Sequence, residues 1–207
     1  MALLVNAAWG ATALAEPVRI LALGDSLTAG YNLAAQEAFP AQLEKALRDA
    51  GYDVAVINAG VSGDTSAGGL ARLDWVLSES SPDLAIVELG ANDGLRGLDP
   101  AHTGANLTAI IERLRRDGVR ILLAGMKAPP NLGAEYAAEF EAVYAELAGR
   151  PGVALYPFFL DGVAANPGLN QKDGIHPTAR GIEVIVERIL PYVTRMLDAA
   201  DGVRSSQ

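Results

Sequence analysis

The chain has 207 residues, half of them hydrophobic and 20% charged, with a formal net charge of -9 at pH 7. This length and composition favour one folded domain with a sizeable core over a disordered chain. The negative charge argues against a nucleic-acid partner, whose phosphates need a basic surface, and against a basic membrane-binding patch. The chain contains no cysteine, which excludes disulfides, a cysteine nucleophile and a zinc site built from thiolates.

The N-terminal segment is apolar, and it carries no charge before Glu16. Ala13-Leu14-Ala15 has the small-x-small pattern of a signal-peptide cleavage site, so we interpret residues 1–15 as the remnant of a signal peptide. The basic residues that usually precede the apolar stretch are missing. The stretch is too short to cross a bilayer as a helix, and no stable membrane insertion is expected. A periplasmic or secreted protein is predicted.

After Pro17, short apolar runs alternate with segments whose apolar residues recur at helical spacing. The predicted order is strand 18–25, helix 39–51, strand 53–60, helix 66–80, strand 82–93, helix 100–117, strand 119–129, helix 134–149, strand 153–159 and helix 178–198. Such alternation with short connections is typical of a parallel sheet covered by helices on both faces. We therefore predict one doubly wound α/β domain over residues 16–200 and a frayed tail at 201–207.

Small and polar residues follow the predicted strands, at the edge where a doubly wound sheet binds its ligands. The four runs are Gly24-Asp25-Ser26, Ser62-Gly63-Asp64-Thr65, Gly90-Ala91-Asn92-Asp93-Gly94 and, before the last helix, Asp173-Gly174-Ile175-His176-Pro177. The first run alone fits a tight turn, a phosphate-binding loop or a nucleophile. It lacks the lysine of a P-loop and the glycine spacing of a dinucleotide fingerprint, which disfavours a nucleotide.

A serine nucleophile needs a base to take its proton, and the base is normally a histidine. Of the two histidines, His102 is interpreted as an exposed residue at the start of a helix. His176 follows Asp173 by three residues, so the Asp173 carboxylate can meet Nδ1 and leave Nε2 facing Ser26. An ordinary Asp-rich turn explains this spacing equally well. The presence of Ser26 at the same predicted edge favours a catalytic arrangement.

Acyl transfer also needs hydrogen-bond donors for the oxyanion. We predict that the Ser26 N–H, the Gly63 N–H and the Asn92 side-chain amide supply them, although glycine and asparagine are also ordinary loop residues. Four other residues are given structural roles: Asp25, Asp64 and Asp93 as braces of their turns, and Trp75 as packing on a helix face.

The four runs together resemble the SGNH hydrolases, also called the GDSL esterase and lipase family. The matching blocks are GDSL with Ser26, SGDT with Gly63, GAND with Asn92, and DGIHP with Asp173 and His176. Each block is short, but the ordered set is highly specific and covers residues 24–177. The stretches SGDTSAGGLARL and VELGANDGLRG most closely resemble the bacterial periplasmic branch of multifunctional thioesterases, proteases and lysophospholipases, which includes arylesterases.

This resemblance implies a flavodoxin-like three-layer α/β/α fold with five parallel strands in the order 2-1-3-4-5. It implies Ser26 as nucleophile, His176 as base and acid, Asp173 as the residue that orients it, and an oxyanion hole made by Ser26, Gly63 and Asn92. The expected reaction is hydrolysis of carboxylic esters and acyl thioesters of small molecules or lipids through an acyl-Ser26 intermediate. A monomer that needs neither a metal nor an organic cofactor is expected.

Three apolar residues are candidate substrate-binding residues: Leu95 follows the third predicted strand, and Pro129 and Phe158 lie at the ends of the fourth and fifth. Loop packing is the alternative explanation for them. Within the family, a carbohydrate O-deacetylase is the closest competing activity. Outside it, the alternatives are a non-catalytic carbohydrate- or lipid-binding module, and a metal hydrolase with Asp173 and His176 as ligands. The small number of histidines disfavours the metal hydrolase.

Overall fold

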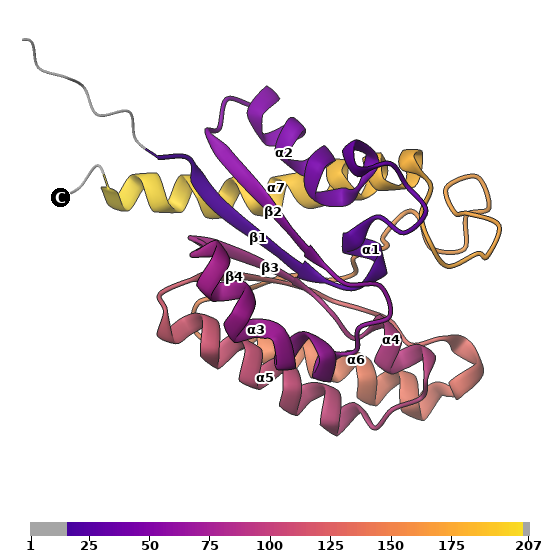
Figure 1. The fold of residues 1–207 in the computed structure, drawn as a ribbon. Helices are drawn as coiled ribbons and strands as arrows, with labels where there is room; N and C mark the ends of the chain where they lie inside the picture. Colours follow the sequence, from indigo (N-terminus) through magenta and orange to yellow (C-terminus); the bar gives the residue numbers. More distant parts are fainter. Residues whose placement is uncertain (1–15, 205–207) are drawn as a thin grey trace, which may run out of the picture.

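The computed structural model describes residues 16–204, with side chains described as far as residue 199. The segment interpreted as a signal-peptide remnant, residues 1–15, therefore lies outside the described residues, as do residues 205–207. The described chain forms three layers, with a twisted parallel sheet between two layers of helices (Figure 1).

Over residues 16–204 the sheet has five strands in the order β2-β1-β3-β4-β5, and each neighbouring pair is parallel. This arrangement confirms the predicted fold. The strands are β1 (Val18–Gly24), β2 (Val54–Gly60), β3 (Leu84–Glu88), β4 (Arg120–Ala124) and β5 (Val153–Tyr156). All residues of β3 are buried because helices cover both faces of the sheet.

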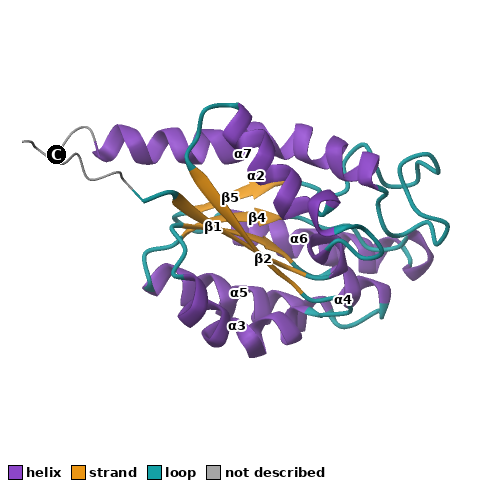
Figure 2. Cartoon of the chain, turned by 45° about the horizontal axis from the view of Figure 1, so that its top comes forward, coloured by secondary structure: helices purple, strands orange, loops and turns teal. Residues whose placement is uncertain are grey.

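Long helices cover both faces of the sheet, as Figures 1 and 2 show. On one face lie α2 (Phe39–Asp49) and α7 (Ala179–Arg204), and on the other lie α3 (Ser66–Ser80), α5 (Pro100–Arg116) and α6 (Ala134–Ala148). Four short elements occur in the connections: α1 (Ser26–Ala29), η1 (Ala35–Glu37), α4 (Ala91–Leu95) and η2 (Pro130–Leu132). Among the described residues, no helix has both the length and the apolarity needed to span a membrane.

Three strands, β3, β4 and β5, end at least three residues earlier than the sequence predicts. The predicted strand 82–93 stops at Glu88, and the helix α4 occupies part of its predicted range. The apolar runs continue past the strands because the loops that follow are themselves buried, with Leu89, Met126 and Phe159 in the core. The prediction relied on apolar runs, which continue into these buried loops, and it therefore placed the strand ends beyond the last hydrogen-bonded residues of the sheet.

Two further predictions differ from the structure. Helix α7 continues to Arg204, past the predicted helix end at 198 and into the predicted tail. The prediction that Trp75 packs on a helix face is wrong, because its side chain is 69% exposed. The buried stripe of α3 runs through Leu73, Val76 and Leu77, and a residue two positions after Leu73 lies well away from that stripe.

Candidate active site

The carboxyl ends of the three strands nearest Ser26 lie level with one another. Gly24 of β1 pairs in register with Gly60 of β2 on one side and with Glu88 of β3 on the other. Ser26, Gly63 and Asn92 each follow one of these strand ends within a few residues. Parallel pairing in this register therefore brings the three predicted loops to one edge of the sheet, where α1 and α4 lie in Figure 1.

Ser26 is the first residue of the short helix α1, directly after a buried turn. The side chain of Asp25 caps this helix, because its Oδ1 accepts a hydrogen bond from the Leu27 N–H at 3.0 Å. Burial raises the pKa of Asp25 to about 6, although the bonds from Leu27 and Asn92 act in the opposite direction. Asp25 thus braces the turn as predicted, and its carboxyl gains or loses its proton near pH 6.

The structure brings Ser26, His176 and Asp173 into a continuous hydrogen-bonded chain. Nε2 of His176 lies 2.9 Å from Oγ of Ser26, and its Nδ1 lies 2.7 Å from Oδ2 of Asp173. The other carboxylate oxygen of Asp173 accepts the backbone N–H groups of Ile175 and His176 at 2.9 and 3.0 Å. These backbone bonds, followed by the bond to the imidazole, lower the pKa of Asp173 to about 2. Asp173 is therefore a carboxylate at neutral pH, as a residue that orients a histidine base must be.

A glutamine that sequence reasoning missed holds the histidine loop in place. Nε2 of Gln171 donates to the carbonyls of Tyr31 at 2.8 Å and Pro177 at 2.9 Å, and its backbone N–H donates to the His176 carbonyl at 2.7 Å. The Tyr31 ring lies against the His176 ring with 4.4 Å between centroids. Because Gln171 is distant in sequence from Tyr31, no local motif could have identified this contact.

The two other predicted oxyanion donors are held by neighbouring side chains. Nδ2 of Asn92, in α4, donates to Oδ2 of Asp25 at 2.9 Å, which fixes the amide and leaves its second N–H for a ligand. Gly63 has a φ of +87°, a conformation that side chains other than glycine rarely adopt. Its carbonyl accepts a hydrogen bond from Arg96 at 2.9 Å, which ties the Gly63 loop to the end of α4.

Asp64 and Asp93 brace their loops, as the sequence predicts. Arg72 of α3 pairs with Asp64 at 2.7 Å and also donates to the Gly24 carbonyl at 3.0 Å, so it links the Gly63 loop to the end of β1. The buried Asp93 carboxylate accepts the Ser66 N–H at 2.8 Å, the Ser66 hydroxyl and the Thr103 hydroxyl.

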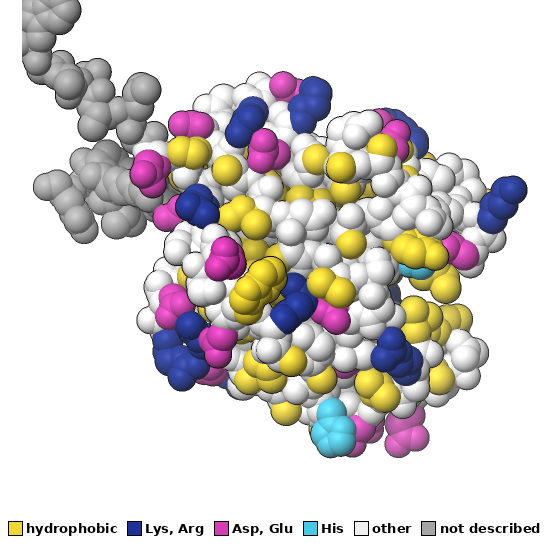
Figure 3. Space-filling model, in the orientation of Figure 1, with side chains coloured by type: hydrophobic (Ala, Val, Ile, Leu, Met, Phe, Trp, Pro, Cys, Tyr) yellow, Lys and Arg dark blue, Asp and Glu magenta, His cyan; other side chains and the backbone are white. Residues whose placement is uncertain are grey.

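The three candidate substrate-binding residues follow β3, β4 and β5 in succession away from Ser26. Leu95 ends α4 with 48% of its side chain exposed, and Pro129 lies close by, since a Cβ on Gly94 would be 3.6 Å from its Cδ. Phe158 lies one strand further, with the Lys127 ammonium 5.2 Å from its ring centroid. Figure 3 shows hydrophobic side chains on both sides of a hollow at the right, on the side toward which the strands point in Figure 1.

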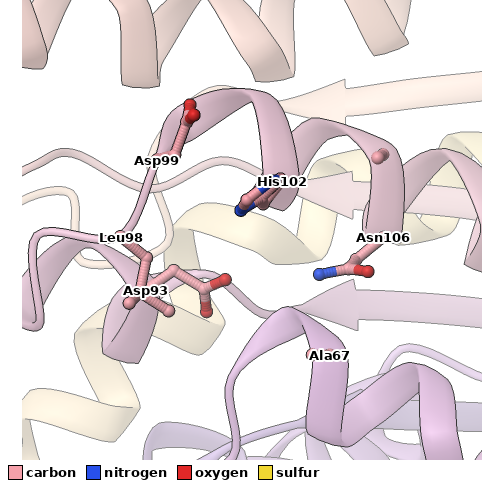
Figure 4. Close-up of a pocket in the computed structure, with 7 residues that line it drawn as sticks. Ala67, Asp93, Leu98, Asp99, His102 and Asn106 are labelled. Atoms are coloured by element: carbon pink, nitrogen blue, oxygen red, sulfur yellow. The ribbon is translucent and has the colours of Figure 1, made fainter.

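A cavity of about 310 Å³ lies apart from Ser26, His176 and Asp173, between α3, α5 and the loop that joins α4 to α5. His102 of α5 is exposed at its rim and does not join Ser26 and Asp173, as predicted (Figure 4). The lining residues are Ala67, Asp93, Leu98, Asp99, His102, Ala105 and Asn106. Within the described residues, no cluster of three or more His, Cys, Asp or Glu side chains is arranged to hold a metal ion.

Comparison with known proteins identifies close relatives over most of the chain. Residues 22–184 match the GDSL-like Lipase/Acylhydrolase family. Esterase TesA of Pseudomonas aeruginosa is 44% identical over 86% of this chain and 89% of its own length. Thioesterase 1/protease 1/lysophospholipase L1 of Escherichia coli is 42% identical over 76% of this chain and 74% of its own. The crystal structure of AlinE4, an SGNH-hydrolase family esterase, is 52% identical, with a TM-score of 0.75 over 89% of this chain and 99% of that one.

Proposed function

Because the chain belongs to the GDSL-like lipase and acylhydrolase family, the SGNH hydrolases, and is an ester hydrolase, we propose that it cleaves carboxylic esters and acyl thioesters through an acyl-Ser26 intermediate. The observation that carries this proposal is the hydrogen-bonded chain from Asp173 through His176 to the Ser26 hydroxyl. Related proteins named as esterase, thioesterase and lysophospholipase support the range of substrates.

In the first half of the reaction, Nε2 of His176 takes the proton of the Ser26 hydroxyl as Oγ attacks the acyl carbonyl carbon. Asp173 holds the proton on Nδ1 and stabilises the imidazolium that forms. The N–H groups of Ser26 and Gly63 and the free amide hydrogen of Asn92 stabilise the oxyanion. The C–O or C–S bond then breaks, and the leaving alcohol or thiol receives the proton from His176.

In the second half, His176 takes a proton from water, and the resulting oxygen nucleophile attacks the acyl-Ser26 ester. The same donors stabilise the second oxyanion, and His176 returns its proton to Ser26 Oγ as the carboxylic acid leaves. Leu95, Pro129 and Phe158 are proposed to contact the acyl chain, since they are the apolar residues at the ends of the three strands that lead away from Ser26.

We also propose that the protein is exported to the periplasm or secreted and acts as a monomer. The export proposal rests on the apolar segment 1–15 and its Ala13-Leu14-Ala15 pattern. Fractionation of cells that express the full chain, with sequencing of the mature N-terminus, tests the first statement. Light scattering of the purified protein tests the second, because a dimer mass at assay concentration would contradict it.

The catalytic proposal is tested with an alkyl phosphonate that carries a p-nitrophenyl leaving group, followed by peptide mass mapping. We expect one adduct, on Ser26, and none in Ser26→Ala. A series of p-nitrophenyl esters of increasing chain length, with an acyl-CoA, a lysophospholipid and an acetylated xylan beside them, then defines the substrate class. A covalent adduct on another residue, or a folded Ser26→Ala that keeps its activity, would overturn the proposal. Activity on the acetylated sugar alone would favour a deacetylase.

A further inference from the structure

A buried carboxyl contacts the turn that carries Ser26, and the reaction described above does not use it. Glu88 is the last residue of the central strand β3, and its side chain is completely buried. The paired register of β1 and β3 places it opposite Gly24, two residues before Ser26. Acidic side chains are seldom fully buried unless they have specific partners, so the contacts of Glu88 call for an explanation.

One oxygen of Glu88 contacts the chain on both sides of Ser26. Oε2 accepts the hydroxyl of Thr28 at 2.6 Å and the backbone N–H of Asp25 at 3.3 Å. Asp25 directly precedes Ser26, and Thr28 follows it by two residues in the same short helix. The turn that carries the nucleophile is therefore attached to the end of β3 at two points.

The turn has room for the Glu88 carboxyl because residue 24 is a glycine. A Cβ on Gly24 would lie 2.1 Å from Oγ1 of Thr28 and 2.5 Å from Oε2 of Glu88. Such distances are well inside van der Waals contact, so any side chain at position 24 would displace the carboxyl or the threonine hydroxyl. The glycine before Ser26 thus leaves the space in which Glu88 meets Thr28.

We propose that Glu88 is a positioning residue for Ser26, whose Oε2 fixes the Asp25 N–H and the Thr28 hydroxyl and thereby aims the Ser26 hydroxyl at His176. This inference rests on the proposed function, since it gives Glu88 a part in the reaction of Ser26. Small displacements of a nucleophile are costly, because the reacting atoms must be closely aligned. Glu88 touches neither the substrate nor the reacting atoms and acts only through the turn.

Glu88 acts as a neutral acceptor. Burial, and then the negative charge of Asp25, raise the pKa of Glu88 well above its ordinary value. Its second oxygen, Oε1, is buried and has no hydrogen-bond partner in the described part of the chain. The ionisable groups around the strand end are Asp25 after β1, Arg72 of α3 in its pair with Asp64, Asp93 of α4 and the buried Tyr144 of α6.

The test compares two substitutions of nearly the same size. Glu88→Gln keeps a neutral carbonyl oxygen for Thr28 and Asp25, whereas Glu88→Met fills the space but accepts neither bond. Glu88→Met leaves the buried Thr28 hydroxyl and Asp25 N–H without this acceptor, so its folding is checked by circular dichroism before its kinetics are compared, and Glu88→Gln tests the inference independently. Tyr156→Phe is the matched control, because it removes the other buried polar atom that lacks a partner in the described residues.

In Glu88→Met we expect kcat for a short p-nitrophenyl ester to fall by about 30-fold or more, with KM within about threefold and an equal loss in the rate of phosphonylation. Glu88→Gln should restore kcat to within about threefold and leave the acid limb of the pH–rate profile unchanged. Tyr156→Phe should match the parent. A folded Glu88→Met with full kcat would overturn the inference, as would a Glu88→Gln that fails equally or shifts the acid limb.

A crystal structure of Glu88→Met tests the role of Glu88 separately from the proposed function, because a measured distance does not depend on which reaction the protein catalyses. We expect the distance from Ser26 Oγ to His176 Nε2, 2.9 Å here, to lengthen beyond hydrogen-bond range. An unchanged distance would overturn the role of Glu88 whatever the reaction is. By contrast, only the retained activity of Ser26→Ala or a phosphonate adduct elsewhere would contradict the proposed function.

Discussion

Asp173 binds His176 twice, once through the imidazole Nδ1 and once through the backbone N–H three residues later in the chain. His176 and Asp173 are therefore parts of a single short turn. Their relative position depends on local backbone geometry, and only the approach of this turn to Ser26 depends on the rest of the fold.

The first prediction concerns Asp173→Asn. The amide keeps the size of the carboxylate but does not stabilise the imidazolium, and it favours the wrong tautomer of His176. We expect kcat for a p-nitrophenyl ester to fall by about 100-fold or more, with KM little changed. Asp53→Asn, the same replacement at an exposed position, is the control. A loss of less than threefold in Asp173→Asn would remove Asp173 from the mechanism.

The second prediction concerns Asn92 and its contact with Asp25. Asn92→Ala should lower kcat by about 10²–10³, because an oxyanion donor is lost. Asp25→Asn places an amide where Asn92 needs an acceptor, so it should also lower kcat. Because both changes act on one donor, the double variant should be no slower than Asn92→Ala alone. Additive losses in this double-mutant cycle would show that Asp25 does not act through Asn92.

The third prediction is a pH dependence of stability that comes from Asp25. Burial raises the pKa of Asp25 from 3.8 to about 6 in the folded chain. When the pKa of a carboxyl is higher in the folded chain than in the unfolded chain, its protonation stabilises the fold. This stabilisation is complete at pH values below the unfolded-state pKa, and it is lost as the pH rises through about 6. Between about pH 4.5 and pH 8, the parent should lose on the order of 2 kcal/mol of unfolding free energy relative to Asp25→Asn.

Urea denaturation of both proteins across this pH range measures the effect. The difference in unfolding free energy between the parent and Asp25→Asn should stay constant above about pH 7. Parallel pH curves for the parent and Asp25→Asn would mean that Asp25 does not titrate in this range.

The fourth prediction concerns the contacts that hold the histidine loop. Gln171→Met keeps the length of the side chain but donates to neither the Tyr31 nor the Pro177 carbonyl. We expect kcat to fall by about 3–10-fold while KM stays level, because His176 is held less precisely. Gln36→Met, the same change at an exposed position, should have no effect. Equal kinetics for the two variants would argue that the His176 turn needs no support from Gln171.

The fifth prediction concerns acyl-chain contact. Leu95→Ala should lower kcat/KM by about fivefold for an octanoyl or longer ester, since part of the apolar contact is lost, and leave the acetyl ester unchanged. Trp75→Ala removes a more exposed apolar side chain from α3 and should leave kcat/KM unchanged for both the long-chain ester and the acetyl ester. A uniform loss across chain lengths in Leu95→Ala would place Leu95 outside the acyl-binding surface.

The order of the elements could be predicted because each buried strand is a continuous apolar run and each covering helix has an apolar stripe. The end of β3 could not, since Leu89 is as buried as the strand that it follows. Trp75 was misjudged for a related reason. A count of apolar residues along α3 does not distinguish the buried stripe from a single apolar residue beside it.

The contact of Ser26, His176 and Asp173 could be predicted from the sequence because the fold places strand ends at one edge and because an Asp three residues before a His can reach its Nδ1. Gln171 and Glu88 were not identified. Both act through contacts between segments far apart in the chain, with a backbone carbonyl for Gln171 and with Thr28 for Glu88. Contacts of this kind depend on the packed structure and leave no local pattern of residues.

Ser26 and His176 meet although 150 positions separate them in the chain. A growing polypeptide contains Ser26 from the first strand onward, but His176 is added only while the last quarter of the chain is being made. In the proposed mechanism, Ser26 therefore lacks its base until the turn that carries His176 has been made and has docked. Hydrolysis by this mechanism then requires the C-terminal part of the chain to be in place beside the first strand.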